Sequence, residues 1–274
     1  RAMLHSASAP GHVEPPLGDA GDMAHGLADV AAASGLRARR ATAQAGPSLS
    51  MSRRPRGACL LVFARDPRPG RVKTRLVPAL GPDLAVAVYR ELLRDTLQTA
   101  AGSTAARLEL WVDRPDPGPY LTEAAHTAGM QLHSQRGSDL GLRMHHALAH
   151  ALARCGSAVL IGSDCPEFDP DYLDRAFDAL RHRDAVIGPA ADGGYVLIGL
   201  KRPQPALFRG IRWGGPQVLE TTRARLRSLG LDWQELRTLH DLDEPGDLAR
   251  FPRLAARARA AIAPGTRAPD GRRD

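Results

Sequence analysis

The nine residues from Ala158 to Pro166, AVLIGSDCP, constrain the fold of this chain more than any other stretch. Four apolar residues, two of them β-branched, run into a glycine, a serine and then the carboxylate of Asp164. This pattern predicts a buried parallel strand with an acid at its carboxyl end. Because ligands of open α/β sheets bind outside the carboxyl ends of the strands, we expect Asp164 to face a binding site. A hard divalent cation needs such a carboxylate, although Asp164 could instead cap the helix expected to follow.

Strands and helices alternate along the chain from residue 59 onward. The sequence predicts strands at 59–64, 108–112, 130–133, 158–162, 185–188 and 195–200, helices at 82–101, 120–128, 138–154, 171–180, 216–229 and 245–262, and a last extended segment at 233–239. Strands that alternate with helices of about ten or more residues favour βαβ units and a mostly parallel sheet. The strands on either side of 190–194 are too close for a helical crossover, so we expect one of them to be antiparallel.

The two ends of the chain differ from its middle in composition. Residues 1–55 are rich in Ala, Gly, Ser, Pro and His without apolar periodicity, which predicts a disordered extension or a misassigned start. We expect a single domain over 56–262 and a disordered basic tail over 263–274. No apolar run approaches the roughly 18 residues that a membrane span needs. The three cysteines form neither an even disulfide set nor a metal-ligand spacing, which favours a reducing, cytoplasmic location.

The chain carries a net charge of +7, yet its aromatic content is only 4%. Just two of its 37 basic residues are lysines, Lys73 and Lys201, and no aromatic-interleaved basic strip is present to stack bases. Nucleic acid is therefore not the expected partner. A small anionic substrate accounts for a mildly basic protein equally well.

A basic loop, 65–81, lies between the first predicted strand and the first predicted helix. It contains the run GRVKTRL, in which Lys73 and Arg75 stand on either side of Thr74. A strand, a basic loop and a helix together form the topology of a phosphate site, because backbone N–H groups and the helix dipole add to the cations. Arg65 belongs to the same cluster. The alternative is a solvated basic loop without a ligand.

Two acidic stretches could complete a site. In the first, Asp192 precedes Gly193 and Gly194; its carboxylate could hold a sugar hydroxyl or act as a base, although the glycines also suit a tight turn. The second, HDLDEPGDL at 240–248, has four acids at the start of a predicted helix. Helix capping explains some of them, and Asp243 could be a second cation ligand beside the acid that ends the buried strand.

Three histidines, His145, His146 and His150, lie on the helix predicted at 138–154, two of them four residues apart on one face. The accompanying Glu of the metalloprotease pattern is missing, as is a third ligand nearby. We therefore expect solvated or core-edge histidines here rather than a zinc site.

Six stretches occur in a characteristic order: FARDPRPGRVKTRLVPALG (63–81), QRGSDLGLRM (135–144), GSDCP (162–166), ADGGYVLIGL (191–200), IRWGGPQVL (211–219) and HDLDEPGDL (240–248). With them the chain resembles, over about 58–252, a family of bacterial glycosyltransferase-like proteins of GT-A fold, formerly of unknown function and associated with radical-enzyme and arsenosugar gene clusters. The family belongs to the nucleotide-diphospho-sugar transferase superfamily. The resemblance implies a Rossmann-like α/β fold with a mixed, mostly parallel sheet and helices on both faces. It also implies a nucleotide sugar or NTP as ligand, and Mg or Mn.

Residue roles follow from the motifs that match. The acid that ends the fourth strand of the superfamily maps onto Asp164, and a second metal ligand maps onto Asp243, in a pattern where Glu244 and Gly246 replace two family residues. The expected site residues are Arg65, Lys73, Thr74, Arg75, Asp139 and Arg143 for the nucleotide and its phosphates; Gly193, Gly194, Tyr195 and Trp213 for the sugar or acceptor; Asp192 and Asp164 for catalysis; and Asp164 and Asp243 for the metal.

The expected activity is a metal-dependent, glycosyltransferase-like transfer from a nucleotide-diphosphate sugar to a small-molecule acceptor. The alternative is a guanylyltransferase-like nucleotidyl transfer to a phosphorylated small molecule, with release of pyrophosphate. The chain departs from both patterns, because ARDPRPGRVKTRL replaces the Gly-rich nucleotidyltransferase loop and Ser163-Asp164-Cys165 replaces the Asp-x-Asp of glycosyltransferases. A third, non-enzymatic hypothesis gives the basic tails a role in binding nucleic acid.

Overall fold

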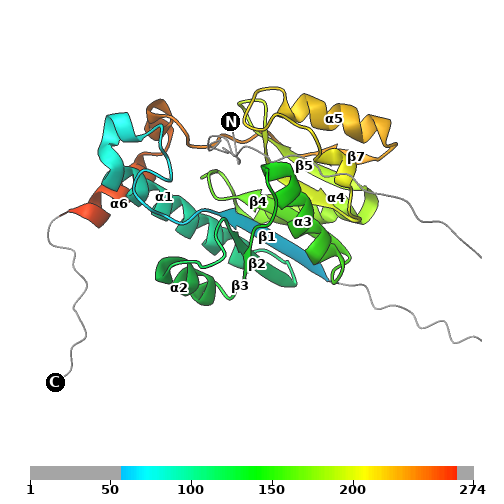
Figure 1. Cartoon of the computed structure of the whole chain (residues 1–274), viewed down its shortest axis with the longest axis horizontal. Coiled ribbons are helices and arrows are strands. Elements are labelled where there is room, and N and C mark those ends of the chain that lie inside the picture. The colour runs from blue at the N-terminus through cyan, green and yellow to red at the C-terminus, as the bar shows by residue number, and fades with distance from the viewer. Residues whose placement is uncertain (1–56, 264–274) are drawn as a thin grey trace, which may run out of the picture. The chain divides into compact units, whose positions relative to one another are not determined.

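The computed structural model of the chain describes residues 57–263, which include the elements labelled in Figure 1. The predicted N-terminal extension and all but the first residue of the predicted tail lie outside the described residues. The elements are β1 (Ala58–Ala64), α1 (Val77–Ala101), β2 (Arg107–Val112), α2 (Pro119–Thr127), β3 (Gln131–Ser134), α3 (Leu140–Leu152), β4 (Ser157–Gly162), α4 (Pro170–His182), β5 (Ala185–Pro189), β6 (Tyr195–Leu200), α5 (Val218–Ser228), β7 (Trp233–Glu235) and α6 (Pro252–Ile262), with short 3₁₀ helices at Pro205–Leu207 and Pro245–Arg250.

The seven strands form one sheet in the order β3-β2-β1-β4-β6-β5-β7. Every neighbouring pair is parallel except the two that involve β6, which runs antiparallel to both β4 and β5. The loop that joins β5 to β6 is too short to carry the chain back to the opposite edge, so the chain reverses there. The predictions of a mixed, mostly parallel sheet and of an antiparallel strand next to 190–194 are both confirmed.

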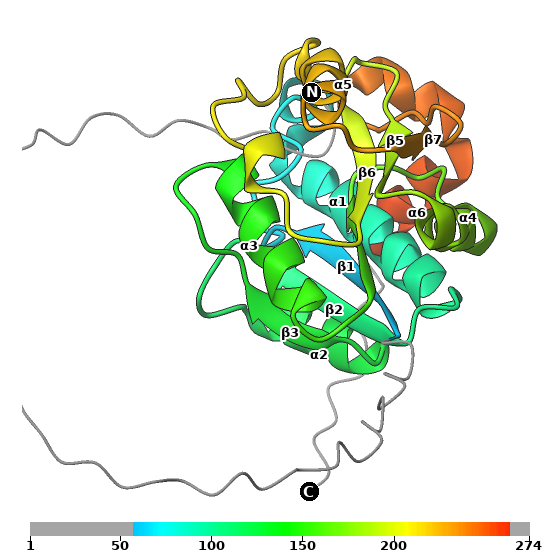
Figure 2. The same cartoon turned by 90° about the vertical axis from the view of Figure 1, so that its right-hand side faces the viewer.

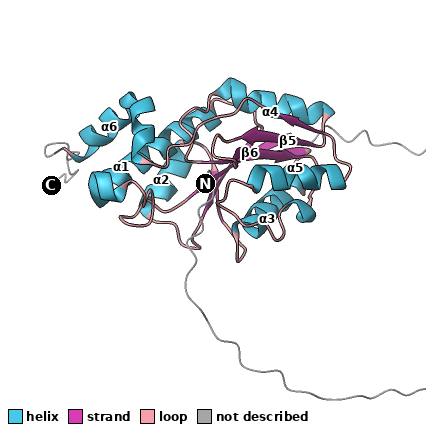
Figure 3. Cartoon of the chain, turned by 90° about the horizontal axis from the view of Figure 1, so that it is seen from above, coloured by secondary structure: helices cyan, strands magenta, loops and turns pink. Residues whose placement is uncertain are grey.

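Helices cover both faces of the sheet, as predicted. Figure 2 shows α1 and α3 on opposite sides of β1, and Figure 3 shows α4 on one side of β5 and β6 and α5 on the other. The central strands β1 and β4 are apolar along almost their whole length and nearly free of solvent contact, as strands covered on both faces must be. None of the helices formed by residues 57–263 combines the length and hydrophobicity that a membrane crossing needs.

Two prolines change the helix boundaries from those predicted. The first helix already begins at Val77, but Gly81 has φ 76° and ψ 163°, so Pro82 opens a second helical segment after a kink. The helix predicted at 245–262 is interrupted at Phe251, whose φ of −125° and ψ of 58° are not helical. A residue that precedes a proline is pushed away from the α region, and Pro252 follows directly.

The register of the central strands brings two chain segments to the same edge of the sheet. Phe63 of β1 pairs with Gly162 of β4, so the residues that follow both strands leave the sheet side by side. The basic loop that begins at Arg65 therefore lies next to Ser163 and Asp164. The site described below starts from this edge.

Candidate functional site

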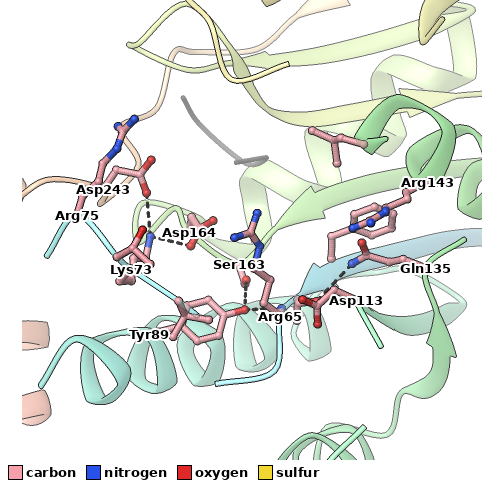
Figure 4. A pocket seen from close by; sticks show the side chains of 15 residues that line it. Arg65, Lys73, Arg75, Tyr89, Asp113, Gln135, Arg143, Ser163, Asp164 and Asp243 are labelled. Carbon is pink, nitrogen blue, oxygen red and sulfur yellow. Dashed lines mark hydrogen bonds and ion pairs between the residues drawn. The ribbon is translucent and has the colours of Figure 1, made fainter. Parts of the chain in front are cut away.

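A pocket lies at the carboxyl edge of β1, β2, β3 and β4 (Figure 4). The space inside it is about 840 Å³, and this figure includes a part that is open to solvent. It is lined by Phe63, Ala64, Arg65, Val72, Lys73, Thr74, Arg75, Tyr89, Asp113, Gln135, Leu140, Arg143, Ser163, Asp164 and Asp243. Figure 4 shows Lys73, Asp164 and Asp243 at one end of the pocket and Arg143 at the other.

The ammonium group of Lys73 lies between the carboxylates of Asp164 and Asp243, the two residues predicted from the sequence to bind a metal ion. Its Nζ is 2.7 Å from Asp164 Oδ1 and 3.1 Å from Asp243 Oδ1, and it donates to the backbone oxygen of Leu242 at 2.5 Å. The side chain is only 3% exposed. Burial alone would lower the pKa of Lys73, but the charges of Asp164 and Asp243 outweigh burial and raise it. Lys73 is therefore a permanent cation here, and its donors are directed at protein acceptors.

The backbone of the loop is strained at the same residue. Lys73 has φ 47°, and it is the only non-glycine residue with positive φ between residues 57 and 263. This conformation costs an L-residue about 1–2 kcal/mol. Strain of this kind persists only where surrounding contacts over-determine it, and the three contacts of the ammonium group do so.

Asp243 reaches the pocket because its segment is fastened across the end of β4. The backbone N–H of Leu242 donates to the backbone oxygen of Asp164 at 3.0 Å, and the N–H of His240 donates to Glu167 Oε2 at 2.9 Å. These bonds join residues more than 70 positions apart in sequence. The sequence analysis did not single out Glu167, because an acid in a turn gives no signal of a distant partner.

A third carboxylate, Asp241, lies beside this pair. Its Oδ2 is buried without a hydrogen-bond partner among the described residues. Desolvation, then the charge of Asp243, raises the pKa of Asp241 from 3.8 to about 6. Asp241 thus interacts electrostatically with Asp243, Lys73 and Asp164, although its side chain lines the neighbouring pocket described below rather than this one.

We expect Asp241→Asn to make the protein more stable at neutral pH when divalent ions are removed with EDTA. A carboxyl group with a raised folded pKa binds more protons in the folded state, so wild-type stability falls as the pH rises from about 4 to 6. The amide carries no such charge, and the variant should gain about 1–3 kcal/mol in the free energy of unfolding by pH 7. Urea unfolding at several pH values measures this. The same pH slope in both proteins would contradict it.

Oxygen donors that converge on one point are the ligands a hard divalent cation prefers. Asp164 Oδ1 and Asp243 Oδ1 both contact the same Lys73 atom, and Asp241 supplies a further buried oxygen without a hydrogen-bond partner among residues 57–263. This donor set fits Mg²⁺ or Mn²⁺. The point of convergence coincides with the ammonium group, so a cation bound by both carboxylates requires Lys73 to move.

Tyr89 of α1 connects the loop to the strand end, and the sequence analysis missed it. The backbone N–H of Arg65 donates to Tyr89 Oη at 2.7 Å, and the same hydroxyl is 3.0 Å from Ser163 Oγ. Burial, then the charge of Asp164, raises the pKa of Tyr89, so the hydroxyl stays protonated. In the sequence, only its position on the buried face of a predicted helix could have pointed to Tyr89.

Tyr89→Phe is expected to lower the free energy of unfolding by about 1–3 kcal/mol, because it leaves the N–H of Arg65 and the hydroxyl of Ser163 without their partner. Chemical denaturation measures the loss. Tyr120→Phe is the matched control, since the hydroxyl of the half-buried Tyr120 donates to the Arg90 carbonyl over a long 3.4 Å and the ring contacts survive the change. Equal losses in the two variants would show that the Tyr89 network contributes nothing particular.

Most of the predicted phosphate-binding residues line the pocket. These are Arg65, Thr74, Arg75 and Arg143, together with Lys73. Arg143 Nε donates to the Gly137 carbonyl at 3.1 Å, which holds the guanidinium at the end of the pocket opposite Lys73. Asp139 is not among the lining residues. It is the N-cap of α3, where its Oδ1 accepts from the N–H of Leu142 at 2.8 Å.

Asp192 lines a neighbouring pocket that shares Arg75 and Asp243 with the first. Its Oδ1 accepts from the N–H of Gly194 at 2.9 Å, in a tight turn. Gly193 has φ 88°, and a Cβ there would lie 2.3 Å from the Pro216 carbonyl oxygen, so this glycine is required for packing. The turn interpretation of the two glycines therefore fits their positions.

The two aromatic residues predicted to contact an acceptor differ in their burial. Tyr195 is 2% exposed in the core, with its hydroxyl 3.9 Å from Met144 Sδ, because every residue of β6 is covered on both faces. It therefore does not fit the predicted contact. Trp213 is half-buried and packs against Gly141, where a Cβ would lie 2.7 Å from its ring. It lines neither of the two pockets described here, and its contact with an acceptor stays a prediction.

Two further polar residues of the pocket escaped the sequence analysis. Gln135 Nε2 donates to the backbone oxygens of Trp111 at 3.0 Å and Ala64 at 3.3 Å, and so ties together the ends of β1 and β2. Asp113 Oδ1 accepts from the N–H of Asp66 at 3.1 Å. Each follows the last residues of a strand, which is the positional signal that identified Asp164.

Comparison with known proteins places this geometry in context. The sequence profile of a family described as "Uncharacterized protein conserved in bacteria (DUF2064)" matches residues 96–215. A Desulfovibrio desulfuricans G20 protein assigned as a nucleotide-diphospho-sugar transferase is 32% identical, over 74% of this chain and 97% of its own, with a TM-score of 0.65. None of the curated proteins compared with this chain matches it.

Two more distant solved structures have TM-scores below 0.5. A CMP:2-keto-3-deoxy-manno-octonic acid synthetase, solved with CTP, is 12% identical over 73% of this chain and 98% of its own, with a TM-score of 0.49. Glucosyl-3-phosphoglycerate synthase from Mycobacterium tuberculosis was solved with Mn²⁺, UDP and glucosyl-3-phosphoglycerate. It is 12% identical over 76% of this chain and 78% of its own, with a TM-score of 0.44.

Proposed function

This chain belongs to the nucleotide-diphospho-sugar transferase superfamily of GT-A-like fold, and on that premise we propose that it transfers a sugar from a nucleoside diphosphate sugar to a small-molecule acceptor with the help of Mg²⁺ or Mn²⁺. The chain is accordingly an enzyme of the transferase class. The observation that carries the proposal is the meeting of Lys73, Asp164 and Asp243 within 3.1 Å, at the end of a pocket also lined by arginines.

The donor's diphosphate is bound between the cations of the pocket. Arg65, Arg75 and Arg143 supply planar guanidinium groups that can each grip two phosphate oxygens, and Thr74 adds a hydroxyl. Lys73 holds the two carboxylates close together, and its ammonium group can donate to a phosphate oxygen if the side chain shifts. The main role of these cationic side chains is to stabilise the negative charge of the departing nucleoside diphosphate.

Asp164 and Asp243 would hold the divalent cation, with Asp241 adjacent. A divalent cation at this position would supply positive charge to the leaving diphosphate. The carboxylates of Asp164 and Asp243 would determine where the cation binds at the end of the pocket. Their attachment to β4 and to the 240–243 segment, which is bonded to β4 through Leu242, makes that position rigid.

The acceptor binds in the neighbouring pocket, which shares Arg75 and Asp243 with the donor pocket. Asp192 is the proposed base that removes the proton of the acceptor hydroxyl as its oxygen attacks the anomeric carbon. The bond between that carbon and the diphosphate oxygen breaks, and the electron pair leaves with the nucleoside diphosphate.

The three cysteines are buried and unpaired, which supports a reducing compartment, and we propose the cytoplasm.

Release of nucleoside diphosphate tests the proposal. The full chain is incubated with Mg²⁺ or Mn²⁺ and single nucleotide sugars, with a mixture of small alcohols and sugar phosphates as acceptors. Parallel reactions contain NTPs and are assayed for pyrophosphate. We expect metal-dependent release of nucleoside diphosphate that is absent in Asp164→Asn. Pyrophosphate from an NTP without any turnover of sugar nucleotides would overturn the proposal in favour of nucleotidyl transfer.

A further inference from the structure

A second group of metal-ligating side chains lies under α3, away from the pocket. Glu109 of β2, His133 of β3 and His150 of α3 each have one ligand atom within 4.8 Å of those of the other two. Figure 2 shows these three elements side by side. The expectation that the α3 histidines lack a further ligand nearby is therefore wrong, because the missing partners come from two neighbouring strands rather than from the same stretch of sequence.

Two imidazole nitrogens, one in this cluster and one next to it, are buried without a hydrogen-bond partner among residues 57–263. They are His133 Nε2 and His146 Nδ1. A buried polar atom without a hydrogen bond costs free energy, and native proteins leave few of them. An imidazole nitrogen that makes no hydrogen bond can serve as a ligand of a metal ion.

The guanidinium of Arg154 marks the point at which two of these ligands converge. Its Nη2 lies 2.5 Å from Glu109 Oε1 and 3.0 Å from His150 Nδ1. Glu109 is 1% exposed and needs a cation beside it, whereas the Arg154 side chain is 36% exposed. Arg154 can therefore turn into solvent, while the carboxylate has to remain where it is.

We propose that Glu109, His133 and His150 bind a divalent transition-metal ion, with Zn²⁺ as the expected ion, at the position now taken by the Arg154 guanidinium. Two imidazoles and a carboxylate form a ligand set that suits Zn²⁺ and its neighbours, in contrast to the oxygen-only set of the pocket. Trp111 orients the ligands: its Nε1 donates to Glu109 Oε2 at 2.9 Å, and its ring stacks on His133 at 4.8 Å.

The ion would join the two outer strands to α3. These elements also carry residues of the pocket, since Gln135 follows β3 and Arg143 lies in the first half of α3. The three ligands belong to elements separated by loops, so the ion would act as a cross-link between them. Its expected role is to stabilise the fold, and the proposal does not depend on the reaction assigned to the pocket.

Cobalt binding tests the site directly, because Co²⁺ held by nitrogen ligands in tetrahedral geometry absorbs visible light strongly. The full chain is stripped with EDTA, titrated with Co²⁺ and then with Zn²⁺ as competitor. We expect about one equivalent of Co²⁺ to produce the visible band, and His133→Ala or His150→Ala to weaken this binding by at least about 100-fold. His182→Ala, at the exposed end of α4, is the control and should bind as wild type does. A wild-type titration without a visible band, or unchanged binding in the two ligand variants, would overturn the proposal.

Two further variants test the position of the ion and distinguish this metal site from the pocket at Asp164. Arg154→Ala removes the competing cation, so we expect tighter Zn²⁺ binding than in wild type and a larger rise of the melting temperature on adding Zn²⁺. Zn²⁺ affinity unchanged or weaker in Arg154→Ala would contradict the assigned position. Asp164→Asn should leave the cobalt spectrum intact, which keeps a failure here distinct from a failure of the proposed transferase activity.

Discussion

Asp164→Asn is expected to lower metal-dependent release of nucleoside diphosphate by about 100-fold or more, because the amide keeps the shape of the side chain but removes the charge that faces the cation. The fold should survive, since the amide oxygen can still accept from Lys73 and that lysine keeps its contacts with Asp243 and Leu242. Initial rates at saturating Mn²⁺, together with Mn²⁺ affinity by calorimetry, measure the two effects.

The control for this loss is Asp178→Asn, which makes the same chemical change at an exposed position on α4, where the carboxylate pairs with Arg181 at 3.4 Å. It should keep the rate and the Mn²⁺ affinity of wild type. Wild-type turnover in Asp164→Asn would remove the carboxylate from the mechanism. A reduced rate with unchanged Mn²⁺ affinity would show that Asp164 acts on Lys73 and the substrate rather than through the cation.

Lys73→Met is expected to lower the free energy of unfolding by about 3–5 kcal/mol in the absence of divalent ions. The variant leaves Asp164 and Asp243 close together without their shared cation, and it also removes the donor to the Leu242 carbonyl. Adding Mg²⁺ or Mn²⁺ should then raise the melting temperature far more than in wild type, because the ion can take the place of the ammonium group. Thermal unfolding across a metal titration measures both effects.

The chain's only other lysine offers a matched control. Lys201 is partly exposed and lies 3.9 Å from Asp184, so Lys201→Met should change the free energy of unfolding by no more than about 0.5 kcal/mol and add no metal dependence. If Lys73→Met is destabilised without any recovery on adding metal, the carboxylates do not form a cation site. If it is as stable as Lys201→Met, the buried ion pair has no energetic role.

The sheet could be predicted from the sequence because the patterns that indicate its strands span only a few residues each. The buried strand before Asp164 and the antiparallel turn at 190–194 follow from short apolar runs and a short loop, and both are confirmed. The helical turn before Gly81 was missed and the break at Phe251 was not predicted, since a glycine or a proline interrupts a helix without erasing the helical pattern on either side. Tyr195 was misassigned because a strand that is covered on both faces exposes none of its side chains.

The candidate site divides in the same way. Sequence could place Lys73 in a basic loop and Asp164 at a strand end, because each sits in its own recognisable stretch. It could not show that the ammonium lies between Asp164 and Asp243, since that contact joins positions 170 residues apart through a segment bonded across the sheet edge. Nor could it bring Glu109 to His150, which depends on how α3 crosses two strands.

By itself, therefore, the sequence determined which side chains are available and which edge of the sheet most of them occupy, because apolar periodicity and strand direction are encoded over a few residues. Only the tertiary structure decided which charges meet. The partners of Lys73 and of Glu109 depend on strand order and on the packing of distant segments, and a displacement of a few ångströms separates an ion pair from two solvated groups.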